Sequence, residues 1–544
     1  MALLAAAIAI AAGCTEGGGE HAGYSDGQGG RFAAATEIAA APSENPAPNQ
    51  VLRIAGSRPV TLDPALVRDT GSSQYVVELF AGLVKLDSDL NVVGDLAADW
   101  EVLEDGHVYR FDLRSSLKFA DGDALQADDV QSSLARALSP QTKSQTALTY
   151  LGNIEGARAF AQGSTSDLTG VRTLDSETVE IRLVSPSAYF FYQLSHPVSY
   201  VVDVDETHES EWYRSPNSSG PFKLAAWEPG EEIVLEKNDN YHSPPRLSSV
   251  RIALIGSSEA LLRYETGQLD IVRIHRGDVE RFRDSNDPLK DHYQYFPKSS
   301  LFYIGFNAEV PPFDDVHVRR AFAKAIDVEK ITRVSLRGLQ EQANGILPAG
   351  FPGHDPSRMA IGYDPADARA ELAKSTYKSV DALPEIRMLV SGGGLLLPAH
   401  VKASLYLIRE NLGVEIAVQT LEWSSFLNQI YGDMSEFHMY SLGWGADYPD
   451  PHNFLDLMFH SRSPENSSHY SNPEVDGLLE NARVELNRDR RLSLYSRVES
   501  IVVEEAPIIP FWFSVDHLLV RPDVRGLRIP ASTQEWMSSV WIAE

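Results

Sequence analysis

The sequence of 544 residues has little cysteine, little positive charge and no long apolar run. Its only cysteine is Cys14, so no disulfide can form within the chain. Lys and Arg number 47 against 76 Asp and Glu, which gives a net charge of -29. This excess of negative charge argues against nucleic acids and anionic bilayers as partners, because both are polyanions. No apolar stretch is long enough to form a transmembrane helix.

The rest of the composition is that of a large globular protein. Hydrophobic residues make up 43% and aromatic residues 9% of the chain, which is long enough for two or more domains. Residues 108–113 and 178–183 alternate apolar and polar side chains as half-buried strands do. Between Ser73 and Leu83, apolar residues recur at helical spacing. The sequence therefore predicts a folded body with both strands and helices.

The N-terminal segment has the features of a secreted protein. The apolar run from Met1 to Ala12 is too short to span a bilayer and resembles the h-region of a signal peptide. Ala11-Ala12-Gly13-Cys14 resembles the lipobox of bacterial lipoproteins, in which the cysteine becomes the lipid-modified N-terminus. We therefore expect a signal peptide at 1–13, a lipid on Cys14 and a disordered, lipid-anchored tether at 14–50. A buried N-terminal helix with an inert cysteine is the alternative.

One stretch combines an aromatic ring, a carboxylate and two glycines: Gly443-Trp444-Gly445-Ala446-Asp447-Tyr448-Pro449-Asp450-Pro451. Its prolines prevent the backbone from continuing as a helix or a central strand. The glycines let a ligand or another backbone come close, Trp444 offers an apolar face, and Asp447 offers a charge. Two interpretations stay open: a loop that contacts a ligand, or a tight turn with a core tryptophan and an aspartate that caps its own turn.

Signatures of catalysis are absent from the sequence or incomplete. His208-Glu209 is followed by Trp212 at the position where a zinc-binding helix needs a second histidine, and no Gly-x-Ser-x-Gly elbow occurs. Asp447, Asp450 and His452 could in principle hold a metal, although aspartates beside prolines more often form turns. We therefore expect no catalytic residue, no metal site and no cofactor.

Motifs spread over residues 51–540 follow one another at regular spacing; they include Leu62-Asp63-Pro64, Ala98-Asp99-Trp100, Ser219-Gly220-Pro221-Phe222, Pro312-Phe313-Asp314-Asp315 and the segment from Gly443 to Pro451. Together they resemble the family 5 solute-binding proteins, the extracytoplasmic receptors of peptide and nickel ABC importers. The resemblance implies an α/β fold, a two-lobed periplasmic-binding-protein clamshell (type II, cluster C) with an extra inserted subdomain.

The same resemblance implies where the lobes begin and end. Lobe I would comprise residues 51–80, 203–300 and 511–544, and an inserted subdomain would occupy 81–202. Lobe II would comprise residues 301–510. The chain would then cross between the lobes near Ser300 and Phe511, where hinge strands are expected.

The resemblance also implies ligand contacts. In oligopeptide-binding members, the aspartate of the Gly-Trp-x-x-Asp loop pairs with the ligand's α-ammonium group, and Asp447 is that residue here. The other residues placed at the ligand are Gly443, Trp444, Gly445, Trp423, Thr70, Gly71 and Ser72.

For the carboxylate at the other end of the ligand, the sequence lacks the residue that the resemblance implies. Ser441 stands where such members carry an arginine for the ligand's carboxylate, and Arg68 stands where a relative has an acidic residue. Another base would then hold the carboxylate, or the ligand lacks one; the candidates are Lys298, Arg337 and Arg387.

The function implied is that of a monomeric lipoprotein at the periplasm or cell surface. It would capture an oligopeptide between its lobes, close over it and deliver it to the permease of an ABC importer. A non-peptide solute, such as chelated nickel or an oligosaccharide, is the alternative within the family. An enzyme or a periplasmic chaperone is the alternative outside it.

Overall fold

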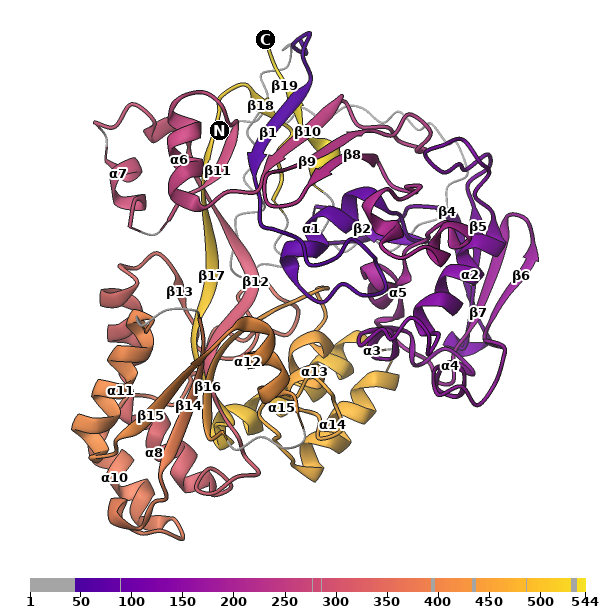
Figure 1. Cartoon of the computed structure of the whole chain (residues 1–544). Helices are drawn as coiled ribbons and strands as arrows, with labels where there is room; N and C mark the ends of the chain where they lie inside the picture. The colour runs from indigo at the N-terminus through magenta and orange to yellow at the C-terminus, as the bar shows by residue number, and fades with distance from the viewer. Residues whose placement is uncertain are drawn as a thin grey trace, which may run out of the picture.

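The computed structural model describes residues 45–88, 90–275, 277–284, 286–392, 397–432, 437–485, 487–529 and 536–544. Two lobes lie one above the other in Figure 1, joined by the long strands β12 (Tyr293–Phe306) and β17 (Ile508–Val520). Within the described ranges, every helix is too short or too polar to cross a membrane. The predicted signal peptide, Cys14 and most of the predicted tether lie outside the described residues.

One mixed sheet runs through both lobes in the order β15-β14-β16-β12-β17-β11-β1-β10-β9-β8. The upper-lobe strands are β1 (Val51–Ala55), β8 (Phe222–Glu228), β9 (Glu232–Lys237), β10 (Ser249–Ala253) and β11 (Ile271–Arg273). The lower-lobe strands are β13 (Glu341–Gln342), which pairs with β17, β14 (Ile386–Ser391), β15 (Ile416–Leu421) and β16 (Met439–Gly445). Alternate side chains of these strands face the core, as Leu52 and Ile54 do in β1.

The two connecting strands change register where they pass from one lobe to the other. β12 pairs with β17 from Tyr293 to Pro297, and pairing resumes only at Leu301. A proline cannot donate to the ladder, and a shift of register bends a strand locally. This irregular stretch contains Ser300, the crossing point that the sequence predicts, while the domain boundaries themselves stay a prediction.

The segment from β4 to α5, within the predicted insert 81–202, forms a smaller body at the right of Figure 1. Its antiparallel sheet has the order β4-β5-β7-β6, with β4 (Ala97–Leu103), β5 (Val108–Leu113), β6 (Val171–Asp175) and β7 (Thr178–Arg182). Four helices and a short hairpin accompany it: α2 (Ala127–Leu138), α3 (Ala147–Leu151), α4 (Ala157–Ala161), α5 (Phe190–Leu194), β2 (Val84–Leu86) and β3 (Val92–Gly94). The alternation in the sequence matches its core, because Phe111, Val179 and Ile181 are fully buried.

The other helices cover the two lobes. They are α1 (Thr70–Leu79), α6 (Ser257–Glu265) and α7 (Val279–Arg283) above, and α8 (Val316–Ala325), α9 (Val328–Lys330), α10 (Pro365–Lys374), α11 (Ala399–Leu412), α12 (Trp423–Ile430), α13 (Leu457–Phe459), α14 (Pro473–Val484) and α15 (Arg488–Glu505) below. The helical spacing up to Leu83 overruns α1, because Phe80 is extended and Ala81 pairs with Val201.

Residues 45–50 pack against the C-terminus, which corrects the end of the predicted tether. The Ala47 N–H donates to the Ile542 carbonyl at 2.8 Å, and the Gln50 side chain both donates to and accepts from the Ile542 backbone. Ile542 belongs to β19 (Trp541–Ile542), which pairs with β18 (Val524–Arg525). The composition of this segment predicted disorder, because composition cannot reveal a partner strand at the far end of the sequence.

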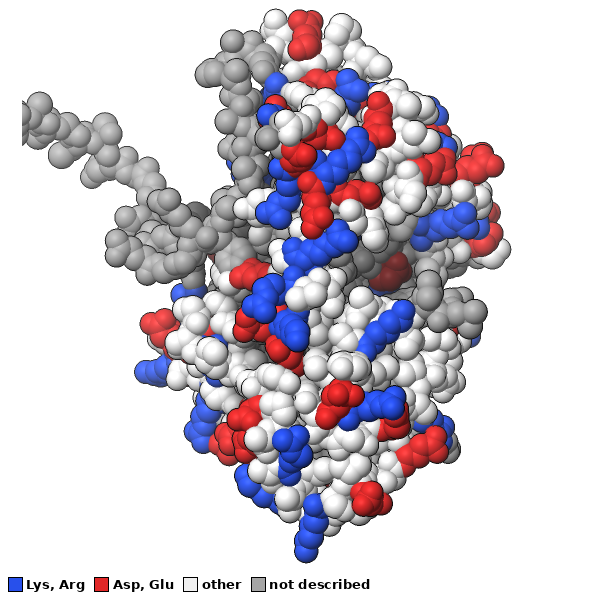
Figure 2. Space-filling view, turned by 90° about the vertical axis from the view of Figure 1, so that its left-hand side faces the viewer, with Lys and Arg blue, Asp and Glu red and all other residues white. Residues whose placement is uncertain are grey.

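The surface carries charges of both signs despite the net negative charge. On the face shown in Figure 2, Lys and Arg lie interspersed with Asp and Glu. Ion pairs of the described residues include Arg251 with Glu232 at 2.6 Å and Arg281 with Asp287 at 2.9 Å. Exposed pairs of this kind contribute little to stability.

Candidate functional site

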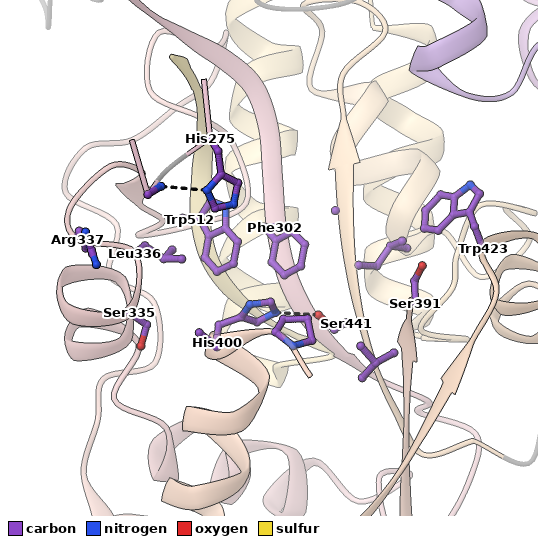
Figure 3. Close-up of a pocket in the computed structure, with 16 residues that line it drawn as sticks. His275, Phe302, Ser335, Leu336, Arg337, Ser391, His400, Trp423, Ser441 and Trp512 are labelled. Atoms are coloured by element: carbon purple, nitrogen blue, oxygen red, sulfur yellow. Dashed lines mark hydrogen bonds between the residues drawn. The ribbon is translucent and has the colours of Figure 1, made fainter. Parts of the chain in front are cut away.

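Two adjoining cavities lie beside β12 and β17, between the lobes. The first, of about 780 Å³, is lined largely by the lower lobe and is shown in Figure 3. The second, of about 910 Å³, is lined by the upper lobe and the connecting strands. His275 and Trp423 line both cavities, and Trp423 is 47% exposed. The cavities therefore form neighbouring parts of one interlobe cleft.

Four of the predicted ligand-contacting residues line these cavities. Gly443 lines the first, Thr70 and Gly71 line the second, and Trp423 lines both. Trp423 begins α12, whose N-cap Glu422 accepts from the Ser424 and Ser425 N–H groups and so fixes the start of this helix.

Ser72 corrects the prediction for its segment. The residue is fully buried and lines neither cavity. Its hydroxyl donates to the Asp69 carboxylate at 2.8 Å and accepts from the Val60 N–H at 2.9 Å. Asp69 is the N-cap of α1, so Ser72 stabilises the start of that helix instead of facing the cleft.

Aromatic side chains make the first cavity mainly apolar. Phe302 and Trp512 stack at 4.3 Å between ring centroids, and the His400 ring meets Trp512 edge-on at 5.1 Å. His400 Nε2 lies 3.2 Å from the Ser441 hydroxyl, and both residues are buried (Figure 3). The cavity suits an apolar group whose few polar atoms meet a histidine and a hydroxyl.

Asp447 lies outside both cavities, where the lower lobe meets residues 81–202. Its carboxylate accepts a hydrogen bond of 2.5 Å from the Tyr150 hydroxyl on α3. Asn453 supports the loop from below, because its side chain accepts from the Asp447 N–H at 3.3 Å and from the Trp444 indole at 3.2 Å. Trp444 is therefore a loop-stabilising residue packed on the lower core, while Gly445 is exposed.

Ring contacts extend this junction along the loop. Tyr189 stacks on His452 at 3.9 Å, and Tyr192 stacks on Tyr448 at 6.1 Å. The Tyr448 hydroxyl also makes a 2.7 Å hydrogen bond with His452 Nδ1. The inserted body thus contacts the lower lobe through aromatic rings on both sides.

The three residues considered as metal ligands have other partners. Asp447 accepts from Tyr150, Asp450 forms a 2.9 Å ion pair with Arg491, and His452 bonds to Tyr448. Among the residues that the structure describes, no three His, Cys, Asp or Glu side chains group closely enough to hold a metal ion.

Charges near Asp447 favour a positively charged ligand group. Burial raises the pKa of Glu465, Arg68 lowers it, and the nearby Asp447 carboxylate raises it further. The Arg68 guanidinium donates to the Gln145 side chain. Two carboxylates face one guanidinium, so a cation entering here gains attraction that an anion would not. Sequence reasoning missed Glu465, Tyr150 and His196, because no local motif marks them.

His196 makes the junction sensitive to pH. Its ring stacks on Tyr150 at 3.7 Å, and its Nδ1 accepts from the Val198 N–H. Burial lowers the pKa of His196 to about 4, although Asp447 opposes the shift. In the unfolded chain a histidine takes up its proton near pH 6.5, so acid favours unfolding as the pH falls from about 6.5 towards 4.

Between pH 7 and pH 5, we expect the free energy of unfolding of the native protein to fall by about 2 kcal/mol more than that of the His196→Asn variant. Asparagine keeps an acceptor for Val198 but does not titrate. Urea unfolding at the two pH values measures the difference. His208→Asn is the control, because His208 is exposed and should leave the pH dependence unchanged. Equal losses in the native and His196→Asn proteins would contradict the assignment.

The two lobes, the pair of connecting strands and the cleft between them define a two-lobed periplasmic binding protein. The structure of the Escherichia coli murein tripeptide binding protein MppA has this architecture: its TM-score to this chain is 0.81 at 25% identity, over 92% of this chain and 99% of that one. The predicted two-lobed α/β fold is confirmed.

Sequence comparison identifies the family. The family model described as bacterial extracellular solute-binding proteins, family 5 Middle, matches residues 91–466. The chain is 32% identical over 503 residues to the probable deoxycholate-binding periplasmic protein YgiS of Escherichia coli (strain K12), covering 89% of this chain and 92% of the relative. It is 26% identical over 510 residues to the oligopeptide-binding protein OppA of Bacillus subtilis (strain 168), covering 89% and 91%. The chain belongs to the bacterial extracellular solute-binding proteins of family 5, which confirms the resemblance of its motifs.

Proposed function

We propose that this protein captures an oligopeptide between its lobes and delivers it to the permease of an ABC importer. The observation that carries the proposal is Asp447, whose carboxylate, with Glu465 beside it, offers a site for the peptide's ammonium group. A ligand that touches both lobes stabilises the closed arrangement over the open one, so capture and closure are linked. The relative OppA, named as oligopeptide-binding, supports this ligand class.

Asp447→Ala is expected to weaken binding of alanine peptides of two to five residues by about 10- to 100-fold, the range of one charge-assisted hydrogen bond. Isothermal titration calorimetry measures the change. N-acetylated peptides are the ligand control: they lack the ammonium group, so both proteins should bind them weakly and alike. Equal affinity of the native protein and the variant for the free peptides would show that Asp447 does not hold the ammonium group.

A non-peptide amphipathic acid is the second candidate. The apolar first cavity favours it, and so does the relative YgiS, whose name describes it as probably deoxycholate-binding. Calorimetry with sodium deoxycholate separates it from the peptide hypothesis. For chelated nickel, the described residues offer no cluster of metal ligands, and nothing in the cleft points to an oligosaccharide over the other two.

Anchoring and domain boundaries belong to the same proposal. We infer that Cys14 carries the lipid and that the tether ends at residue 44, because residues 45–50 are held by the C-terminal strand. The lobes would be 51–80, 203–300 and 511–544 for one and 301–510 for the other, with 81–202 inserted. The receptor would act as a monomer at the outer side of the membrane, without a nucleic-acid partner.

A further inference from the structure

Lys298, on the irregular stretch of β12, lines the second cavity. Its side chain is 26% exposed, and the ion pair that the structure gives it, to Asp516, is long at 3.7 Å. Burial lowers the pKa of this lysine, the expected sign for a cation that protein groups stabilise poorly.

Asp516 is shared between two cations. Arg273 Nη2 lies 2.8 Å from the same carboxylate and takes the shorter bond. Asp69, the other carboxylate that lines the cavity, is turned towards α1, where both of its oxygens accept from Ser72. The end of the cavity at Lys298 therefore has two positive groups for one carboxylate, and a ligand anion would supply the missing charge.

Lys298 also lies near the proposed ammonium site. The Ala446 N–H donates to the Ser299 carbonyl at 2.7 Å. Lys298 precedes Ser299 and Asp447 follows Ala446, so in this antiparallel pair both backbones lie just beyond the same end of the β12–β16 ladder. One ligand can therefore reach both charges.

Arg337 and Arg387, the other two candidate bases, are less well placed to bind a ligand's carboxylate. Arg337, at the first cavity, already pairs with Glu280 at 3.0 Å, and both side chains are more than half exposed. Arg387 lies on β14 beside His438 and lines neither cavity.

We infer that Lys298, supported by Arg273, is the anion-binding residue of the cleft and takes a carboxylate of the bound ligand. The inference rests on the proposed function, since for a peptide the group is its C-terminal carboxylate. The ligand would then be held at two opposite charges, with the ammonium group at Asp447 and the carboxylate at Lys298. A steroid acid such as deoxycholate would use the Lys298 site alone.

The test compares three proteins with two forms of one ligand. The alanine peptide of two to five residues that binds most tightly is titrated as the free acid and as the C-terminal amide. In the native protein the acid should bind at least about 10-fold more tightly than the amide. In Lys298→Gln this difference should vanish, because the acid alone loses affinity. Lys298→Arg keeps the charge and should retain most of the difference.

Asp516→Asn provides a change of opposite sign. Without its carboxylate, both cations are released to the ligand, so the acid should bind about 3-fold more tightly or better while the amide is unchanged. Asp516→Asn also tests the assignment if Lys298→Gln does not fold. If Asp516→Asn and the native protein bind the acid with equal affinity, the assignment of Lys298 is overturned. Thermal melting checks the fold of each variant.

The outcomes separate the inference from the proposed function. If the acid and the amide bind equally to the native protein, the anion site is wrong while peptide capture stands. If no alanine peptide binds but deoxycholate does, and Lys298→Gln weakens it at least 10-fold, the anion site stands and the peptide assignment falls. If neither the peptides nor deoxycholate bind, both are overturned.

Discussion

Glu499→Ala is expected to lower the free energy of unfolding by about 3–5 kcal/mol, the cost of breaking a buried ion pair. Glu499 lies on α15 and is 1% exposed. One of its carboxylate oxygens accepts from the N–H groups of Ile346 and Leu347, at 2.7 and 3.1 Å. The other lies 2.9 Å from Arg358 Nε, whose side chain is only 10% exposed. Alanine would leave two amides without their acceptor and the buried guanidinium without its nearest carboxylate, although Ser496 and Ser500 would still accept from that guanidinium.

Denaturant unfolding with Glu504→Ala as the matched control measures this effect. Glu504 lies on the same helix and pairs with Arg320 at 3.1 Å, but its side chain is 75% exposed. Its removal should change stability by less than about 1 kcal/mol. Glu499→Gln keeps an acceptor for the amides and should fall between the two. Similar losses for Glu499→Ala and Glu504→Ala would show that burial does not decide the strength of these pairs.

Gly305→Ala is expected to cost about 3 kcal/mol, the upper end of the range for overpacking a core. Gly305 lies on β12 directly opposite Tyr440 of β16. A Cβ at this position would overlap the Cζ, Cε1 and hydroxyl atoms of the Tyr440 ring. That ring is fully buried and bonded to Ser467 at 2.8 Å, so it has no room to move aside.

A double-mutant cycle tests the cause of this loss. In a Tyr440→Leu background the overlapping atoms are gone, so Gly305→Ala should cost much less there. Gly445→Ala is the matched glycine control, because no atom lies within 4 Å of its added Cβ and little change is expected. The explanation fails if Gly305→Ala costs the same with either residue at position 440.

The loop from Gly443 to Pro451 shows how much of the structure the local sequence can predict. Its glycines, prolines and aspartate predicted a loop, and the spacing of its motif suggested a ligand contact for Asp447. Trp444 shows the limit, because its indole bonds to Asn453, a residue outside the motif that no spacing rule connects to it. Whether a tryptophan faces a ligand or its own loop depends on which neighbours fill the space around it.

The sequence by itself determined the broad outline of this protein. Hydrophobic alternation predicted strands such as β5 and β7, and ordered motifs predicted the family and thereby the two lobes. Such signals are local or recur across a family, so they are readable without coordinates.

Only the tertiary structure decided which distant residues meet, at the cleft and elsewhere. Tyr150 reaches Asp447 from 297 positions away, and Lys298 on β12 and Arg273 on β11 converge on Asp516 of β17. The pairing of residues 45–50 with the C-terminus was likewise invisible in their composition. The physical reason is common to all three: a buried charge or an unpaired backbone amide takes whichever partner the folded chain brings within about 3 Å, however far apart the two lie in sequence.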